Sequence, residues 1–96
     1  MTTIMSIKCK MNDFDAFMQV YKASDETHAQ VGIIASTMYR DTDDPNVVTV
    51  HHQFADLEAA KATAVQWNSD EVREGWRKVG FAQIDTMEIT VLQTVE

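Results

Sequence analysis

Two adjacent histidines, His51 and His52, are the residues of this sequence best suited to chemistry. They lie in the stretch VVTVHHQF, residues 47–54, whose β-branched residues predict a strand. Neighbouring residues of a strand point to opposite faces of its sheet. His52 has the parity of Val50 and Phe54 and is expected on the apolar, covered face, whereas His51 is expected on the other face.

His52 is the candidate catalytic residue. A titratable side chain among apolar neighbours must be hydrogen-bonded or must face a cavity. In the first case it is a structural histidine bonded to a carbonyl or a water. In the second case it lines a pocket and could serve as a general base, which is expected to titrate near neutrality. The sequence leaves both interpretations open.

Hydrophobic spacing predicts the elements that position this histidine. Strands are expected over residues 3–11, 33–40, 47–54 and 84–95. One helical segment, capped by Asn12 or Asp13, stops at Gly32; another starts at Asp56, breaks near Asn68 and Ser69, and ends at Gly80. The order β-α-β-β-α-β predicts a ferredoxin-like α+β fold, with a four-stranded antiparallel sheet and two helices on one face. We expect residues 1–96 to form one domain.

Soft and aromatic side chains gather on the faces that the sheet and the helices turn toward each other. Six methionines in 96 residues is a high count, and Met both fills irregular cores and tolerates varied ligands. These side chains could form a filled core, or they could line an apolar cavity in which Tyr21 or His52 holds the polar end of a ligand. The candidate pocket residues are Met5, Ile7, Cys9, Phe17, Met18, Tyr21, Val50, His52, Phe54, Trp67, Trp76, Met87 and Ile89.

The opposite face of the sheet is only partly polar, which is unusual for a face left to water. Its small and β-branched residues would suit burial against the same face of a second chain, related by two-fold symmetry. The alternative is a monomer with a wet, Thr-rich face. The candidate dimer-interface residues are Ser6, Thr49, His51, Thr86 and Thr90.

Charge and composition exclude several functions. A net charge of −7 argues against nucleic acid and anionic membrane surfaces as partners, and no apolar run approaches the roughly 20 residues of a membrane span. The N-terminus has no signal-peptide pattern, and the single cysteine, Cys9, fits a reducing cytoplasm. Without CxxC, HExxH, GxGxxG or P-loop motifs, we expect no metal and no cofactor.

The segments YRDTDDPNVVTVHHQF and DLEAAKA, within residues 32–62, resemble the dimeric α/β-barrel proteins related to antibiotic biosynthesis monooxygenases, and SDEVREGWRKVGF (69–81) resembles their second helical segment. The resemblance implies a homodimer in which two sheets form a barrel and each protomer has a pocket between sheet and helices. Some relatives oxidise polycyclic phenols with O2 and no cofactor, others degrade haem, and others are polyketide cyclases. Haem-degrading relatives use an Asn on the first strand with a Trp and a His on the second helix. This sequence has Trp67 but neither of the other two.

Three hypotheses follow. The first is a homodimer that binds an apolar or amphipathic small molecule, of aromatic, polyketide-like or fatty-acyl-like type. The second, resting mainly on the resemblance, is a cofactor-independent monooxygenase or cyclase in which His52 is the base while Trp67 and Tyr21 position the ring of a phenolic substrate. The third is a purely structural or regulatory dimer, which predicts a solid core.

Overall fold

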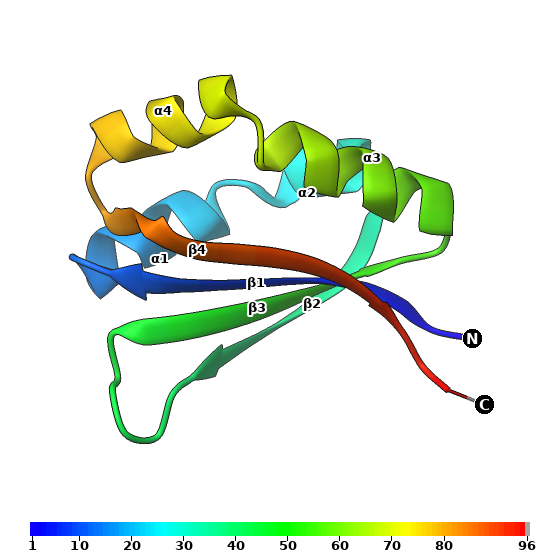
Figure 1. The fold of residues 1–96 in the computed structure, drawn as a ribbon, viewed down its shortest axis with the longest axis horizontal. Helices are drawn as coiled ribbons and strands as arrows, with labels where there is room; N and C mark the ends of the chain where they lie inside the picture. The colour runs from blue at the N-terminus through cyan, green and yellow to red at the C-terminus, as the bar shows by residue number, and fades with distance from the viewer. Residues whose placement is uncertain (96) are drawn as a thin grey trace.

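The computed structural model describes residues 1–95 and confirms the ferredoxin-like α+β fold. The strands are β1 (Thr3–Met11), β2 (Ile33–Arg40), β3 (Val47–Phe54) and β4 (Ala82–Gln93), and the helices are α1 (Phe14–Lys22), α2 (Asp25–Gln30), α3 (Leu57–Trp67) and α4 (Asp70–Val79). All helices lie on one face of the sheet and leave the other face bare (Figure 1). The expected domain includes Glu96, which lies outside the described residues.

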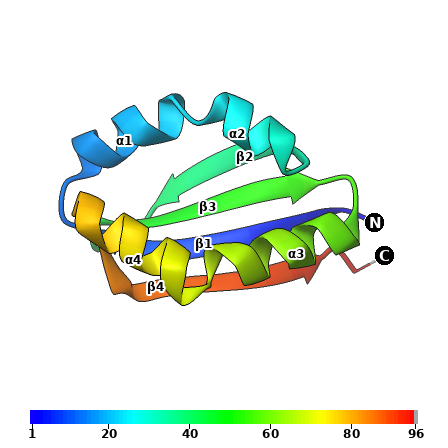
Figure 2. The same ribbon diagram turned by 90° about the horizontal axis from the view of Figure 1, so that it is seen from above.

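The sheet is antiparallel, with the strand order β2-β3-β1-β4. The central pair β1 and β3 aligns Met5 with His52 and Ile7 with Val50, so these side chains share the face that the helices cover. Seen from above, α1 and α2 run along the β2 side of the sheet while α3 and α4 run along the β4 side (Figure 2). The central strands therefore form the floor between two helical walls.

Each wall consists of two short helices and not of one long helix. The carboxylates of Asp13 and Asp56 and the hydroxyl of Ser69 accept backbone N–H bonds at the starts of α1, α3 and α4, as their types predict. Gly32 and Gly80 have φ angles of 98° and 84° at the ends of the two walls, a conformation that favours glycine. The caps and stops thus confirm where the sequence places the helical segments.

Strand β4 begins two residues before the predicted start and contains an irregularity. Its register against β1 shifts between Lys8 and Lys10, and the Thr86 hydroxyl fills the gap by accepting the Lys10 N–H at 2.9 Å and donating to the Gln83 carbonyl at 2.7 Å. Four residues of β4, Ile84 to Met87, lie opposite the single residue Cys9 of β1, and both Ile84 and Met87 are buried although strict alternation would separate them. Both side chains therefore join the helix-facing side.

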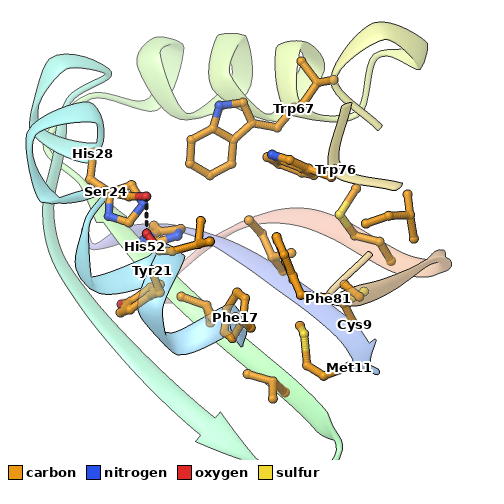
Figure 3. Close-up of a pocket in the computed structure, with 18 of the residues that line it drawn as sticks. Cys9, Met11, Phe17, Tyr21, Ser24, His28, His52, Trp67, Trp76 and Phe81 are labelled. Carbon is orange, nitrogen blue, oxygen red and sulfur yellow. Dashed lines mark hydrogen bonds between the residues drawn. The ribbon is translucent and has the colours of Figure 1, made fainter. Parts of the chain in front are cut away.

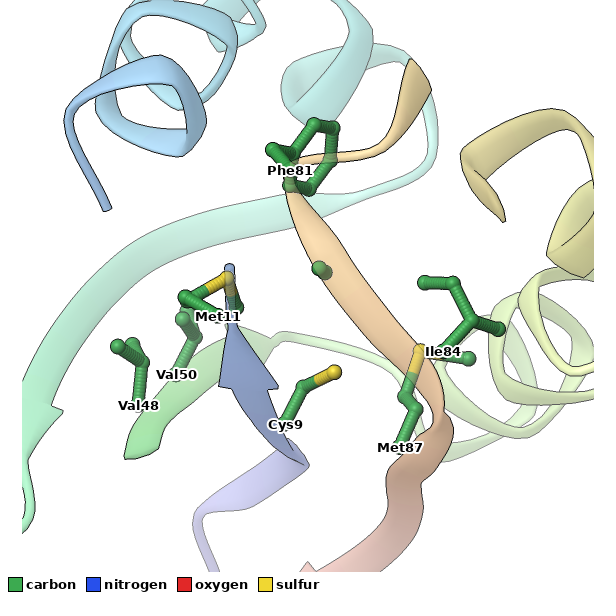
Figure 4. Packing of buried hydrophobic residues seen from close by; sticks show 8 residues of the cluster. Cys9, Met11, Val48, Val50, Phe81, Ile84 and Met87 are labelled. Atoms are coloured by element: carbon green, nitrogen blue, oxygen red, sulfur yellow. The ribbon is translucent and has the colours of Figure 1, made fainter. Parts of the chain in front are cut away.

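The buried apolar residues form two clusters. The larger lies toward α1 and α4 and contains Cys9, Met11, Val48, Val50, Phe81, Ala82, Ile84 and Met87 (Figure 4). The smaller lies at the other end of β1 and β3 and contains Met5, Ile33, Phe54 and Ala60, with Ala60 supplied by α3. None of the helices within residues 1–95 has the length and apolarity needed to cross a bilayer.

Phe54 anchors the smaller cluster and gives a test of this packing. The side chain is 2% exposed, so Phe54→Ala should lower the free energy of unfolding by roughly 3–5 kcal/mol through lost burial and the cavity that remains. Urea denaturation followed by circular dichroism measures this loss. Val65→Ala, at a site 75% exposed on α3, is the control and should change stability little. Equal effects of the two changes would contradict the assignment.

Candidate functional site

A cavity of about 320 Å³ lies over β1 and β3, between the two helical walls (Figure 3). Its floor includes Ile7, Val48 and Val50 from the central strands. α1 contributes Phe17 and Tyr21 to one wall. The other wall includes Trp67 from α3 and Trp76 from α4, whose rings meet edge to face with centroids 5.9 Å apart. The space is therefore enclosed mainly by aromatic and aliphatic side chains.

The two ends of the cavity differ in chemistry. Figure 3 shows His28, Ser24, His52 and Tyr21 at one end, and Cys9, Met11 and Phe81 at the other. Thr27 and Gln66 add further polar side chains to the lining, whereas Ala82, Ile84 and Met87 add apolar ones. A ligand that fits both ends must have an apolar body and at least one polar group.

His52 is fixed at the polar end by a single side-chain hydrogen bond. Its Nδ1 lies 2.7 Å from the hydroxyl oxygen of Ser36, the residue directly opposite it on β2. Within residues 1–95 no hydrogen bond engages Nε2, and no buried side-chain nitrogen or oxygen is left without a partner. The Nε2 atom is therefore accessible from the cavity, although His52 is only 3% exposed overall.

A second histidine, His28 of α2, completes the polar end and was not among the residues singled out from the sequence. Its ring centroid lies 4.8 Å from that of His52 and 6.2 Å from that of Trp67. Tyr21, Ser24 and His28 are spaced by three and four residues, which is the spacing of one helical face. That periodicity could have revealed His28, but the sequence does not show that α2 packs over β2 and so brings the His28 ring to that of His52.

Burial makes both histidines uncharged at neutral pH. Desolvation, with a smaller contribution from the neighbouring His28, lowers the pKa of His52 to about 4. Burial also lowers the pKa of His28, an effect that the carboxylate of Asp25 partly opposes. The expectation that His52 titrates near neutrality is therefore wrong. Among residues 1–95 no Asp, Glu, Lys or Arg lines the cavity, so its whole lining is neutral.

The sequence model of antibiotic biosynthesis monooxygenases matches residues 1–64, from β1 into α3. The chain belongs to the antibiotic biosynthesis monooxygenase family. This match covers β1 and α1 as well as the segments after Gly32 that carry the resemblance in the sequence.

Several solved structures share the fold of this chain at low sequence identity. SnoaB from Streptomyces nogalater, described as a cofactor-independent oxygenase, is 12% identical with a TM-score of 0.69, and the match covers 99% of this chain and 94% of SnoaB. A conserved protein from Methanosarcina mazei Go1 is 18% identical with a TM-score of 0.67, covering 99% of this chain and 95% of that one. A putative antibiotic biosynthesis monooxygenase from Bordetella bronchiseptica is 12% identical with a TM-score of 0.66 over the full length of both chains. No curated protein matches this chain.

In this member of the monooxygenase family, the cavity gathers most but not all of the candidate pocket residues. Those that line it are Ile7, Cys9, Phe17, Tyr21, Val50, His52, Trp67, Trp76 and Met87. Met5 and Phe54 are packed in the smaller core cluster, and Ile89 packs against both clusters without lining the cavity. Met18 is half-buried on α1 and is also absent from the lining.

Cys9 lines the apolar end but is not activated. Its thiol lies 3.4 Å from the Gln83 carbonyl and 3.6 Å from the Thr86 hydroxyl. Burial raises the pKa of the thiol, against smaller opposing effects from Thr86, Arg73 and Lys10. A protonated, buried thiol is a poor nucleophile, so Cys9 contributes to the cavity as a small apolar group.

The bare face of the sheet carries the candidate interface residues. Ser6 lies directly opposite His51 on β3 and Thr90 on β4, so these three side chains form a row across the sheet. Thr49 lies opposite Lys8, and the His51 ring contacts the Tyr39 ring edge to face at 5.1 Å. Thr86 differs from the others because its hydroxyl binds backbone groups at the β4 irregularity.

The lowered pKa of His52 predicts a pH dependence of stability. Above the unfolded-state pKa of about 6.5, the ring is neutral in both states. As the pH falls from about 6.5 to about 4, the unfolded chain binds a proton that the folded chain does not. The free energy of unfolding should therefore fall by about 3 kcal/mol across this range.

The measurement compares urea denaturation of the wild type and of His52→Gln across that pH range. Carboxylates titrate in both proteins, so the His52 contribution is the difference between the two curves. Val65→Ala, at an exposed site on α3 that carries no titratable group, is the control and should retain the wild-type pH dependence. A constant difference between wild type and His52→Gln would contradict the neutral, buried state of the ring.

Proposed function

We propose that the protein is a homodimer in which each protomer binds one flat, uncharged, amphipathic molecule in the cavity between sheet and helices. The observation that carries the proposal is the cavity itself, which has an aromatic lining, no charged side chain within residues 1–95, and its polar groups gathered at one end. Its volume of about 320 Å³ lies at the small end of the range of about 300–1,000 Å³ typical of ligand pockets.

The shape of the walls supports a ligand with fused or substituted rings. Trp67 meets both Trp76 and His52 edge to face, with centroids 5.9 and 5.8 Å apart. Phe17 and Tyr21 lie on the opposite wall, their rings 5.9 Å apart. A planar ligand between these walls gains offset-stacked and edge-to-face contacts with several rings at once.

Electrostatics supports an uncharged ligand. Moving an ionised group from water into a neutral, apolar site costs several kcal/mol or more unless an opposite charge meets it. Neither histidine supplies that charge at neutral pH, because burial keeps both pKa values low. A hydroxyl or carbonyl group can instead exchange a hydrogen bond with Nε2 of His52. A fatty-acyl ligand would on this basis enter as an ester or alcohol and not as a carboxylate.

The dimer is supported by the bare sheet face and by the family, whose members are typically homodimers. The row of Ser6, His51 and Thr90 offers small and medium side chains that a second sheet can cover. Two edge strands, β2 and β4, also gain protection when two sheets close against each other.

The location of the protein in the cytoplasm stays a prediction.

Cofactor-independent oxygenation is the second candidate function. It is favoured by the open Nε2 of His52 in a mainly apolar cavity, and by the likeness to SnoaB, which is described as a cofactor-independent oxygenase. His52 would accept the hydrogen bond of a phenolic hydroxyl while Trp67 and Tyr21 position the ring. With a pKa of about 4, the ring is a weak base, so any rate that needs it neutral should fall only near that pH. A purely structural dimer ranks third because it requires no cavity of this size.

Native mass spectrometry of freshly purified protein, repeated after solvent extraction, tests the binding function directly. A dimer carrying extra mass that reappears in the extract would support the proposal and identify the ligand class. A ligand-free dimer that also fails to take up added 2-naphthol would argue against it. O2 uptake with added phenols would then separate the oxygenase from a binding protein.

Binding should discriminate by charge. Naphthalene, 2-naphthol and 2-naphthoic acid share a ring system, and at neutral pH only the acid is ionised. We expect 2-naphthol to bind at least tenfold more tightly than 2-naphthoate, because the neutral cavity has no positive charge to offset the free-energy cost of desolvating the carboxylate. Quenching of tryptophan fluorescence measures both. Trp67→Leu should weaken 2-naphthol binding, whereas Val65→Ala on the exposed side of the same helix should not. Tighter binding of the acid would contradict the assignment.

The sheet-face dimer should dissociate when charge is placed on the bare face. Thr49→Glu would place a carboxylate from each protomer in the proposed interface, in a chain whose net charge is already −7. Light scattering coupled to size exclusion should then report a monomer. Ala62→Glu, on the exposed side of α3, adds the same charge and should leave the dimer intact. A Thr49→Glu dimer would place the interface elsewhere.

A further inference from the structure

Ser36 connects the cavity to a second, more open hollow on the other side of α2. That hollow has a volume of about 330 Å³, and its lining includes Ser36, Asp25 and Ile34. Tyr21 and His28 line both spaces and so form the partition between them. Ser36 is exposed, whereas its hydrogen-bond partner His52 is buried. The hydroxyl thus lies between a buried imidazole and solvent.

A neutral imidazole has one nitrogen that donates and one that accepts, and the partner of the first nitrogen decides the role of the second. Ser36 is the only hydrogen-bond partner of the His52 ring within the described residues, at 2.7 Å from Nδ1. A serine hydroxyl can donate as well as accept. It therefore fits either tautomer of the ring, which few other side chains would do.

We propose that Ser36 is a positioning residue that lets His52 present either an acceptor or a donor to the ligand. In one state Nδ1–H donates to the Ser36 oxygen, the Ser36 O–H donates to water in the open hollow, and the bare Nε2 accepts from a ligand O–H or N–H. In the other state the Ser36 O–H donates to Nδ1, and Nε2–H donates to a ligand carbonyl. The proposal rests on the binding function above and extends it: one site would hold both hydroxy and keto forms of an aromatic molecule.

The two states exchange by a balanced proton movement. Before a ligand enters, Nε2 gains a proton from a water molecule in the cavity, and the hydroxide that remains leaves to bulk solvent. Nδ1 then gives its proton to the Ser36 oxygen, and Ser36 releases its own proton to water in the hollow. This proton neutralises the hydroxide in bulk solvent, so the net change moves one proton from Nδ1 to Nε2 and leaves no charge in the cavity. The ring is neutral before and after, which agrees with its burial. The reverse movement restores the first state.

Ser36→Val and Ser36→Thr form a matched pair, because valine and threonine have nearly the same shape and both suit a strand, while only threonine keeps the hydroxyl. In Ser36→Val an Nδ1–H would face a methyl group. Since a buried N–H without an acceptor is costly, the ring should adopt the Nε2–H tautomer. The ¹⁵N chemical shifts of the His52 ring nitrogens, measured on the ligand-free full chain, report the tautomer.

Three flat, uncharged tricyclic probes of similar size then test how the His52 tautomer affects ligand binding. Carbazole offers only an N–H donor, 9-fluorenone only a carbonyl acceptor, and fluorene neither. In the wild type and Ser36→Thr, carbazole and fluorenone should both bind more tightly than fluorene. In Ser36→Val, fluorenone should bind as in the wild type, whereas carbazole should weaken roughly five- to tenfold and match fluorene.

The outcomes separate this proposal from the binding function. Equal weakening of all three probes in Ser36→Val would indicate a merely structural role and overturn the proposal. Unchanged carbazole binding, or identical ring-nitrogen shifts in Ser36→Val and Ser36→Thr, would overturn it as well. If no probe binds to any variant, the binding function fails, and the nitrogen shifts of the ligand-free chain still decide whether Ser36 sets the tautomer.

Discussion

The break in each helical wall is the constraint on which the cavity depends. On one continuous helix, Trp67 and Trp76 would point about 180° apart, because nine residues turn through two and a half turns. The break at Asn68 and Ser69, where the Ser69 hydroxyl starts α4 anew, lets both indoles face the sheet and meet each other. In the other wall, α2 follows α1 after a second break and holds His28 beside His52. Each wall therefore bends around a space and does not fill it.

Once that space exists, the electrostatics of its polar end follow. A histidine on the covered face of β3 is desolvated, and a second histidine nearby makes its protonation still harder. Neutral rings can then serve as hydrogen-bond groups that do not demand a counter-charge. Ser36, on the neighbouring strand, forms a hydrogen bond with Nδ1 of His52. The Nε2 atom is then left for a ligand that enters the cavity. The specificity of the site is thus a matter of hydrogen-bond direction and ring shape more than of charge.

The sequence predicted the strands and the helix ends better than it predicted the site. Local strand patterns placed β1, β2 and β3 at the bounds found. The helix ends were marked by the residue types Asn12 or Asp13, Asp56, Ser69, Gly32 and Gly80, because these signals are local as well. Parity along β3 also placed His52 on the covered face. The packing of α2 over β2, which brings the His28 ring to that of His52, is not local, so His28 was missed and the pKa of His52 was expected near neutrality.

Errors in the predicted pocket have the same origin. Met5, Phe54 and Ile89 have the right parity for the covered face. They lie where the helices pack directly against the sheet, so they belong to the hydrophobic core. Parity states which face a side chain occupies and does not state what lies above it. The irregularity in β4, which places both Ile84 and Met87 on the covered side, breaks alternation through the Thr86 hydroxyl and could not be inferred from periodicity.

The two hydrophobic clusters have different roles, since the smaller one stabilises the fold and the larger one borders the cavity. At one end, Met5, Phe54 and Ala60 are 0–2% exposed, and their close packing joins α3 to the sheet. At the other end, the larger cluster borders the cavity, and several of its members, including Met11, Met87 and Cys9, have soft, adaptable side chains. A tightly packed end can hold the sheet and α3 in register while the softer end adjusts to a ligand. This arrangement explains why a chain of 96 residues can keep a cavity without losing the fold that surrounds it.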